Sequence, residues 1–172
     1  MKRKDITLLI GLFCIGVLFR LWVVSLVPQP FVYDQEEYYG YALGILKNGL
    51  HADLYRLWGY PLIIAPLIYF FGVTSPLPWT LFHAVIDTVT AFLVYWIAKK
   101  VFQETGPAWF AFVLYLFNPF SAGYVGVLLS EVVTIFFVTL ISALLLTRKH
   151  FVLALLLGFL PQVRPVFLPL SL

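Results

Sequence analysis

The sequence predicts an all-α, polytopic transmembrane protein of about five membrane-spanning helices, on three observations. Of its 172 residues, 62% are hydrophobic and only 11% are charged, whereas soluble domains carry about 25% charged residues. The apolar residues form tracts of about twenty residues, the length that a helix needs to cross a bilayer. Most of the basic residues lie at the ends of these tracts, at 2–4, 99–100 and 148–149.

The first span is expected at residues 6–27, where Arg20 is the only charged residue. The basic segment at 2–4 before it is reminiscent of a signal peptide. The apolar run is longer than the 7–15 residues of a signal peptide, however, and no small-residue cleavage site follows. We therefore expect an uncleaved span, which Pro28 and Pro30 end.

The next segment, residues 28–78, is expected to be a loop that contains two short amphipathic helices beside the membrane. The first is expected at residues 34–48, where Asp34 can cap the helix and Glu37 completes a capping box. Gly49 can end it. The second, at about residues 60–73, is too short to span a bilayer that needs about 20 residues, so it is expected at the interface. A turn at residues 73–78 follows.

Four further spans complete the predicted fold, separated by short connections. They are expected at residues 79–98, 107–130, 132–147 and 151–172. The second of these should bend near Asn118-Pro119 and Gly123, and the last should be interrupted by Pro161 and Pro165.

The orientation follows from the basic residues, because short loops rich in Lys and Arg stay in the cytoplasm. This places the N-terminus in the cytoplasm and the 28–78 loop outside. The expected location is the cytoplasmic membrane, or the endoplasmic reticulum membrane in a eukaryote. Because the sequence stops at Leu172 inside a span, we expect residues 1–172 to be the N-terminal portion of a longer protein.

The polar residues inside the apolar tracts indicate where a functional site lies. A charge at the bilayer centre costs at least about 2.5–3.5 kcal/mol, so such residues usually face a polar cavity or a partner. With a rise of about 1.5 Å per residue, the predicted spans place these residues in the outer half of the bilayer, on the side of the 28–78 loop. They are Arg20, His83, Asp87 and Arg164, with Glu131 at the outer surface.

Four motifs occur in order along the chain: Tyr33-Asp34-Gln35-Glu36-Glu37-Tyr38-Tyr39-Gly40-Tyr41-Ala42, Arg56-Leu57-Trp58-Gly59-Tyr60-Pro61-Leu62, Ser130-Glu131 and Arg164-Pro165. Together with the basic N-terminus and first span, this order resembles the GT-C superfamily of membrane glycosyltransferases. The resemblance is to the branch that holds protein O-mannosyltransferases and the lipid A aminoarabinose transferase. Many members have an Asp-Glu pair where this chain has Asp34-Gln35.

The resemblance implies a catalytic module that transfers a sugar from a polyprenyl-phosphate-type donor to a lipid or protein acceptor at the outer face. A carboxylate would accept the proton of the acceptor hydroxyl, and arginines would bind the donor phosphate. The implied catalytic candidates are Asp34, Glu36 and Glu37. The implied phosphate ligands are Arg56, Arg164 and Arg20, supported by His83, Asp87 and Glu131.

Cofactors and other partners are less defined by the sequence. No metal-ligand spacing occurs, although the acidic outer loop could hold a divalent cation. Membrane lipids are expected partners, and nucleic acid is not, since the basic residues sit at tract ends.

Structural alternatives stay open for the same residues. Asp34 can be only a helix cap, Glu36 and Glu37 only a solvated first turn, and Arg20 and Arg56 only interface anchors. His83 and Asp87 can pair with each other. Arg164 can pair with Asp87 or Glu131. At the level of function, the alternatives are a transporter or channel subunit, and a noncatalytic membrane assembly factor.

Overall fold

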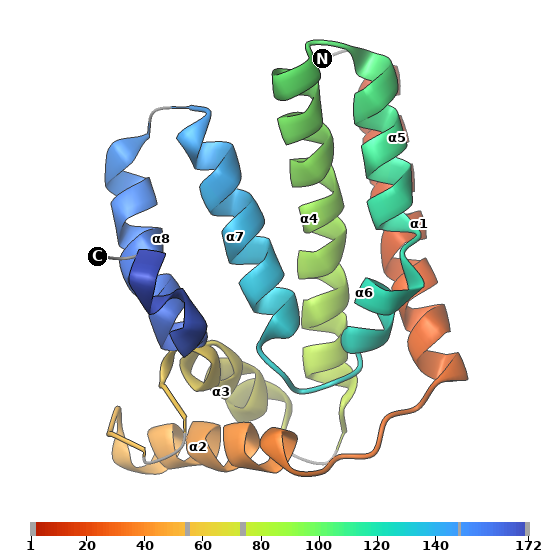
Figure 1. Ribbon diagram of the computed structural model, residues 1–172. Helices are drawn as coiled ribbons and strands as arrows, with labels where there is room; N and C mark the ends of the chain where they lie inside the picture. The colour runs from red at the N-terminus through yellow and green to blue at the C-terminus, as the bar shows by residue number, and fades with distance from the viewer. Residues whose placement is uncertain (1–2, 54–55, 73–74, 148, 171–172) are drawn as a thin grey trace.

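The computed structural model describes residues 3–53, 56–72, 75–147 and 149–170, and every regular element in these ranges is a helix (Figure 1). The all-α prediction is therefore confirmed. Side by side run α1 (Arg3–Leu26), α4 (Leu77–Phe102), α5 (Thr105–Leu116), α7 (Glu131–Leu145) and α8 (His150–Val163). Two short elements, α6 (Pro119–Tyr124) and the 3₁₀ helix η1 (Pro165–Leu170), follow α5 and α8.

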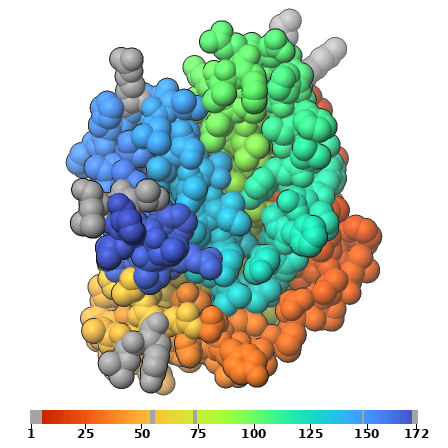
Figure 2. Space-filling view, viewed as in Figure 1, coloured from red at the N-terminus to blue at the C-terminus, as the bar shows by residue number. Residues whose placement is uncertain are grey.

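The helices α2 (Asp34–Asn48) and α3 (Gly59–Phe71) lie across one end of these upright helices (Figure 1). The start of α1 and the connection between α4 and α5 lie at the opposite end. Figure 2 shows α2 and α3 in orange and yellow, closing the end of the molecule below the blue α8 and η1. The acidic segment and the basic connections therefore occupy opposite ends of the fold.

Two of the described helices are long and apolar enough to cross a membrane, namely Ile6–Leu26 within α1 and Leu77–Phe102. Helix α4 is central, in contact with α1, α5 and α7. The apolar helices α7 and α8 have 15 and 14 residues, so at about 1.5 Å per residue they extend about 21–23 Å. That is shorter than the bilayer core of about 30 Å.

The first loop helix has the predicted bounds, Asp34–Asn48, and ends at Gly49, whose φ of 76° suits glycine. The capping prediction is wrong. Tyr33 occupies the N-cap position and no side chain caps the helix. The carboxylates of Asp34 and Glu37 instead reach a cation on the neighbouring connection, described below.

Prolines account for the other differences in element bounds. Helix α4 begins at Leu77, inside the predicted turn, because Pro78 fits the first turn of a helix; residues 73–74 of that turn lie outside the described residues. The predicted span at 107–130 is broken, since the Asn118 side chain caps a new helix, α6. Pro161 stays inside α8, contrary to prediction, and the helix ends before Pro165.

Helices α3 and α8 meet at a glycine. A Cβ built on Gly59 would lie 2.5 Å from the backbone carbon of Gln162 and 2.7 Å from the nitrogen of Val163. Only a residue without a Cβ allows this approach, so Gly59 fixes how closely α3 packs on the end of α8.

A Gly59→Ala substitution is expected to destabilise the protein by about 1–3 kcal/mol, because the obstructing atoms are backbone atoms that cannot rotate away. Gly158→Ala in α8 is the matched control, since a Cβ there meets nothing within 4 Å. It should be neutral or stabilise by up to about 1 kcal/mol. Thermal unfolding of the detergent-solubilised variants measures both, and equal stability would contradict the packing argument.

Candidate functional site

An arginine between α2 and α3 binds two carboxylates of α2. Nη2 of Arg56 lies 2.5 Å from Oδ1 of Asp34, and its Nε lies 2.7 Å from Oε2 of Glu37. Asp34 and Glu37 are three residues apart, so they lie on one face of the helix. One guanidinium therefore holds both acidic side chains on the face of α2 that it approaches.

The same guanidinium lies 4.8 Å from the ring centroid of Tyr38, a cation–π contact. Burial lowers the pKa of Arg56, but the hydrogen bond to Glu37, Tyr38 and the charges of Asp34 and Glu37 outweigh it and raise that pKa. The arginine side chain is 22% exposed, whereas Asp34 and Glu37 are 58% and 47% exposed. These four residues, called the Arg56 cluster below, present charged carboxylates to solvent over a fixed cation.

A second ion pair joins the start of α7 to the end of α8. Nη1 of Arg164 lies 3.2 Å from Oε1 of Glu131. The other carboxylate oxygen, Oε2, is buried and has no hydrogen-bond partner among the described residues. The structure thus shows the alternative in which Arg164 pairs with Glu131, and it leaves part of that carboxylate unsatisfied.

Aromatic side chains connect the two regions. The rings of Tyr38 and Tyr60 meet edge to face at 4.9 Å, and the Tyr38 hydroxyl lies 3.4 Å from Oγ of Ser130, the residue before Glu131. Burial first, then Tyr38 and Glu131, raise the pKa of Tyr60 well above its ordinary value. The Tyr60 hydroxyl therefore stays protonated at neutral pH.

Chain geometry also brings the two arginines into one neighbourhood. Gly59 touches the backbone of Gln162 and Val163. Arg56 is three residues before that contact and Arg164 is one residue after it. The Arg56 cluster and the Arg164 pair (Glu131 and Arg164) therefore flank the same junction of α3 with α8.

His83 has a structural role between α3, α4 and the segment after α6. It is fully buried, with Nε2 3.1 Å from the Tyr60 hydroxyl and Nδ1 3.2 Å from the carbonyl oxygen of Val125. The predicted alternative in which His83 pairs with Asp87 is wrong, because both imidazole nitrogens have other partners. His83 instead joins α4 to α3 and to the segment after α6.

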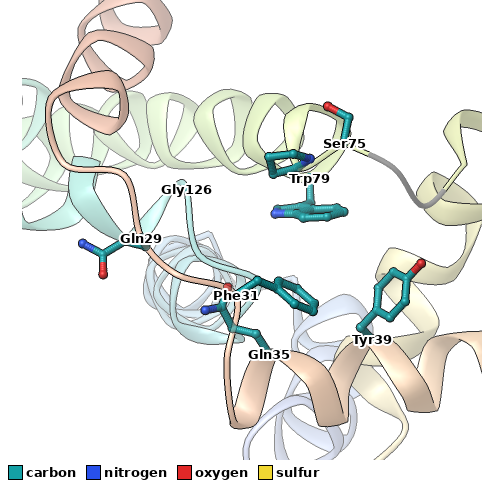
Figure 3. Close-up of a pocket in the computed structure, with 8 residues that line it drawn as sticks. Gln29, Phe31, Gln35, Tyr39, Ser75, Trp79 and Gly126 are labelled. Carbon is teal, nitrogen blue, oxygen red and sulfur yellow. The ribbon is translucent and has the colours of Figure 1, made fainter.

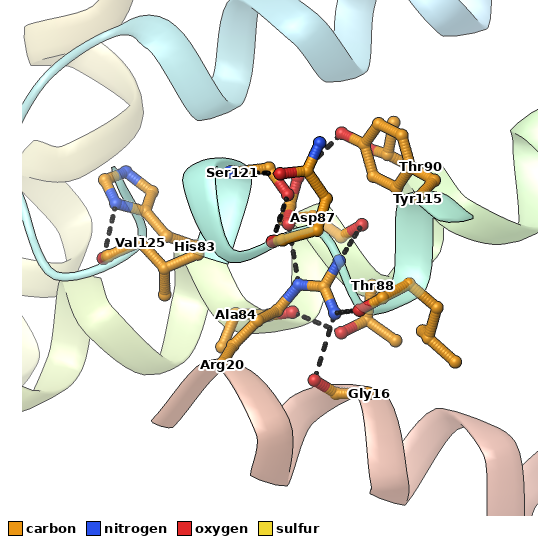
Figure 4. Close-up of polar contacts among 12 residues, drawn as sticks. Gly16, Arg20, His83, Ala84, Asp87, Thr88, Thr90, Tyr115, Ser121 and Val125 are labelled. Carbon is orange, nitrogen blue, oxygen red and sulfur yellow. Dashed lines mark hydrogen bonds and ion pairs between the residues drawn. The ribbon is translucent and has the colours of Figure 1, made fainter. Parts of the chain in front are cut away.

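Arg20 reaches from α1 to Asp87 of α4, inside the bundle (Figure 4). Its Nε is 2.6 Å from Oδ2 of Asp87, and both side chains are almost fully buried. Its remaining groups donate to the carbonyl oxygens of Gly16, Leu116 and Asp87 itself. Tyr115 donates to the other oxygen of Asp87 at 2.8 Å. Arg20 is therefore engaged at every donor nitrogen within the bundle.

The structure brings together only part of the predicted set. Asp34 and Glu37 join Arg56, and Glu131 joins Arg164. Glu36 is exposed, with no ion pair among the described residues. Sequence reasoning missed Tyr60 as a member of the site. The signal it could have used is a tyrosine hydroxyl at the start of an otherwise apolar helix, which needs a partner when buried.

No group of three or more His, Cys, Asp or Glu side chains arranged to hold a metal ion occurs among the described residues. The carboxylates of Asp34 and Glu37 already share the guanidinium of Arg56. A divalent cation at the outer loop stays a prediction.

Comparisons with protein-family models, with curated proteins and with solved structures find no match to this chain.

Proposed function

We propose that this chain is a membrane-embedded glycosyltransferase module that takes a sugar from a polyprenyl-phosphate-type lipid donor at the outer membrane face. The observation that carries the proposal is the Arg56 cluster, in which one arginine fixes two solvent-facing carboxylates beside the Arg164 pair. A glycosyl transfer from a lipid phosphate needs both kinds of group, a base for the acceptor and cations for the leaving phosphate.

The membrane placement is supported by the surface of the upright helices. Large apolar side chains are exposed along α1, α5 and α8, including Leu18, Phe110 and Phe151. Exposed apolar patches of this kind mark a surface that meets another apolar phase. In the proposed topology α1, α4, α5 with α6, α7 and α8 with η1 are the five spans, and the bilayer thins locally to match the short helix α7. Helices α2 and α3 then lie at the outer interface, opposite the basic connections.

The proposed chemistry is a direct displacement at the anomeric carbon. The acceptor hydroxyl oxygen forms the new bond to that carbon while the bond to the phosphate oxygen breaks, and its electron pair leaves with the phosphate. Asp34 takes the hydroxyl proton, and it is accessible because it is 58% exposed. Arg164, 40% exposed, stabilises the charge on the leaving phosphate through its planar fork.

The direct test compares two lipids in nanodiscs that hold the intact chain. One is a polyprenyl phosphate and the other is a polyprenol of equal length. We expect the phosphate lipid to bind at least about tenfold more tightly, because hydrogen bonds to charged groups contribute about 1.5–3 kcal/mol. Equal binding would remove the basis for a lipid-phosphate donor. Neither a transporter of unrelated solutes nor an assembly factor requires this preference.

Arg164→Leu is expected to weaken polyprenyl phosphate binding by about tenfold or more. Its cost in stability should stay within about 1 kcal/mol, because the Glu131 pair is partly exposed. Arg164→Lys should recover the binding only partly, since it lacks the fork. Lys149→Leu, which removes an exposed cation at the opposite end, is the matched control. Full donor binding by the swapped pair Glu131→Arg with Arg164→Glu would instead favour a purely structural ion pair.

A further inference from the structure

A pocket of about 290 Å³ lies between α2, the segment before it, the start of α4 and the segment after α6 (Figure 3). Three aromatic side chains line it, namely Phe31, Tyr39 and Trp79. The ring of Phe31 lies 5.7 Å from that of Tyr39 and 6.2 Å from that of Trp79. The pocket therefore has a continuous aromatic wall.

Trp79, which lines this pocket, carries an indole N–H donor with no partner among the described residues. Trp79 is only 5% exposed, and its Nε1 is buried with no hydrogen-bond partner among the described residues. In Figure 3 the nitrogen edge of the indole lies on the side of Gln29 and Gly126, which also line the pocket. A buried N–H group without a partner is rare in folded proteins, so this donor calls for a ligand atom that accepts.

The polar frame of the pocket is already fixed. Nε2 of Gln35 donates to the carbonyl oxygen of Pro30 at 2.8 Å. The N–H of Leu128 donates to Oε1 of Gln35 at 2.9 Å. These bonds tie the segment before α2 to the segment after α6. The walls of the pocket are thus held in place before any ligand arrives, which lowers the entropic cost of binding.

The lining selects the chemical class of the ligand. The described lining residues carry no charged side chain, so nothing there would compensate a phosphate or an ammonium group. A purely apolar chain would fill the space without using the free Nε1 donor of Trp79, whereas a ligand with an acceptor atom would gain a hydrogen bond there. A pyranose ring has an apolar C–H face for the aromatic wall and hydroxyl oxygens that accept from the indole.

We propose that this pocket is a binding subsite for one neutral sugar ring. Its volume of about 290 Å³ lies at the lower limit of ligand pockets, which span about 300–1,000 Å³, so it suits a monosaccharide unit. Gln35 and Tyr39 line this subsite from α2. Asp34 and Glu37 on the same helix belong to the Arg56 cluster. The inference rests on the pocket and requires no transfer reaction.

Saturation-transfer NMR on the intact chain in nanodiscs tests the subsite. The probes are the methyl glycosides of glucose, galactose and mannose, with methylcyclohexane as an apolar ring of similar size. We expect at least one glycoside to bind and methylcyclohexane to bind at least about tenfold more weakly. Trp79→Phe, which keeps an aromatic ring but removes the N–H, should weaken the glycoside by about tenfold.

Two further variants keep the test decisive. Phe31 is 42% exposed, so Phe31→Leu should fold normally and yet weaken the glycoside through loss of the aromatic wall. Trp22→Phe on the exposed side of α1 is the matched control and should bind as the unaltered chain does. The proposal is overturned if no glycoside binds, if methylcyclohexane binds equally well, or if both pocket variants bind normally. Donor-phosphate binding is measured with a different lipid and a different residue, so either proposal can fail alone.

Discussion

Replacing Asp34 with asparagine is expected to reduce sugar transfer by about 10²–10⁴-fold, the usual contribution of a general base. The asparagine oxygen can still accept a hydrogen bond from Arg56, which pairs with Oδ1 of Asp34, so the cluster keeps its geometry. The amide cannot take the proton of an acceptor hydroxyl. The release of polyprenyl phosphate from a sugar-loaded donor, measured with purified protein in proteoliposomes, reports the rate.

The control for this substitution makes the same chemical change elsewhere. Glu104→Gln lies between α4 and α5, at the end opposite the Arg56 cluster (Figure 1). It should leave the transfer rate unchanged. Both variants should also unfold at the temperature of the unaltered chain, because an exposed ion pair contributes about 1 kcal/mol or less. Normal transfer by Asp34→Asn would exclude the base and leave Asp34 only as a partner of Arg56.

The second large effect is expected at Arg20, on stability. Removing one partner of a buried ion pair costs about 3–5 kcal/mol, because the other charge stays buried. In Arg20→Met that charge is Asp87, whose remaining described side-chain hydrogen bond comes from Tyr115. We expect a loss of that size in the free energy of unfolding, measured by SDS titration of the detergent-solubilised chain.

A double substitution separates the ion pair from general packing. Asp87→Asn removes the charge while keeping an oxygen for Tyr115, so Arg20→Met with Asp87→Asn should recover at least about half of the loss. Lys47→Met, at an exposed cation in the last turn of α2, should cost no more than about 0.5–1 kcal/mol. Additive losses in the double variant would show that the two side chains do not act as a pair.

The fold was predictable where local chemistry decides it. Gly49 ends α2 at the predicted residue because glycine tolerates the positive φ there. Pro161 was misjudged, since whether a proline breaks a helix depends on the neighbours that surround the lost hydrogen bond. Asn118 gave a clear signal, as its side chain caps the helix that follows. The sequence prediction had one bent span there, whereas the structure has two helices, α5 and α6.

The site was only partly predictable because pairing is a long-range property. Arg20 and Asp87 are 67 residues apart, and the sequence indicated only that each needs a partner. Arg56 and Glu37 are 19 residues apart in the sequence. Their contact depends on how α2 and α3 fold back on each other. Gln35 stands where many members of the family that this chain resembles have the Glu of an Asp-Glu pair. Its amide donates to one backbone carbonyl and accepts from another N–H, which a carboxylate cannot do.

The Arg20–Asp87 pair also has a consequence for biogenesis. In the proposed topology, Arg20 enters the membrane when α1 is synthesised, while its partner is still to be made 67 residues later. At about 5–20 residues per second, that interval lasts about 3–13 s. An unpaired arginine in the bilayer costs at least about 2.5–3.5 kcal/mol. Helix α1 is therefore expected to stay at the insertion machinery until α4 arrives, so that the two helices enter the lipid together.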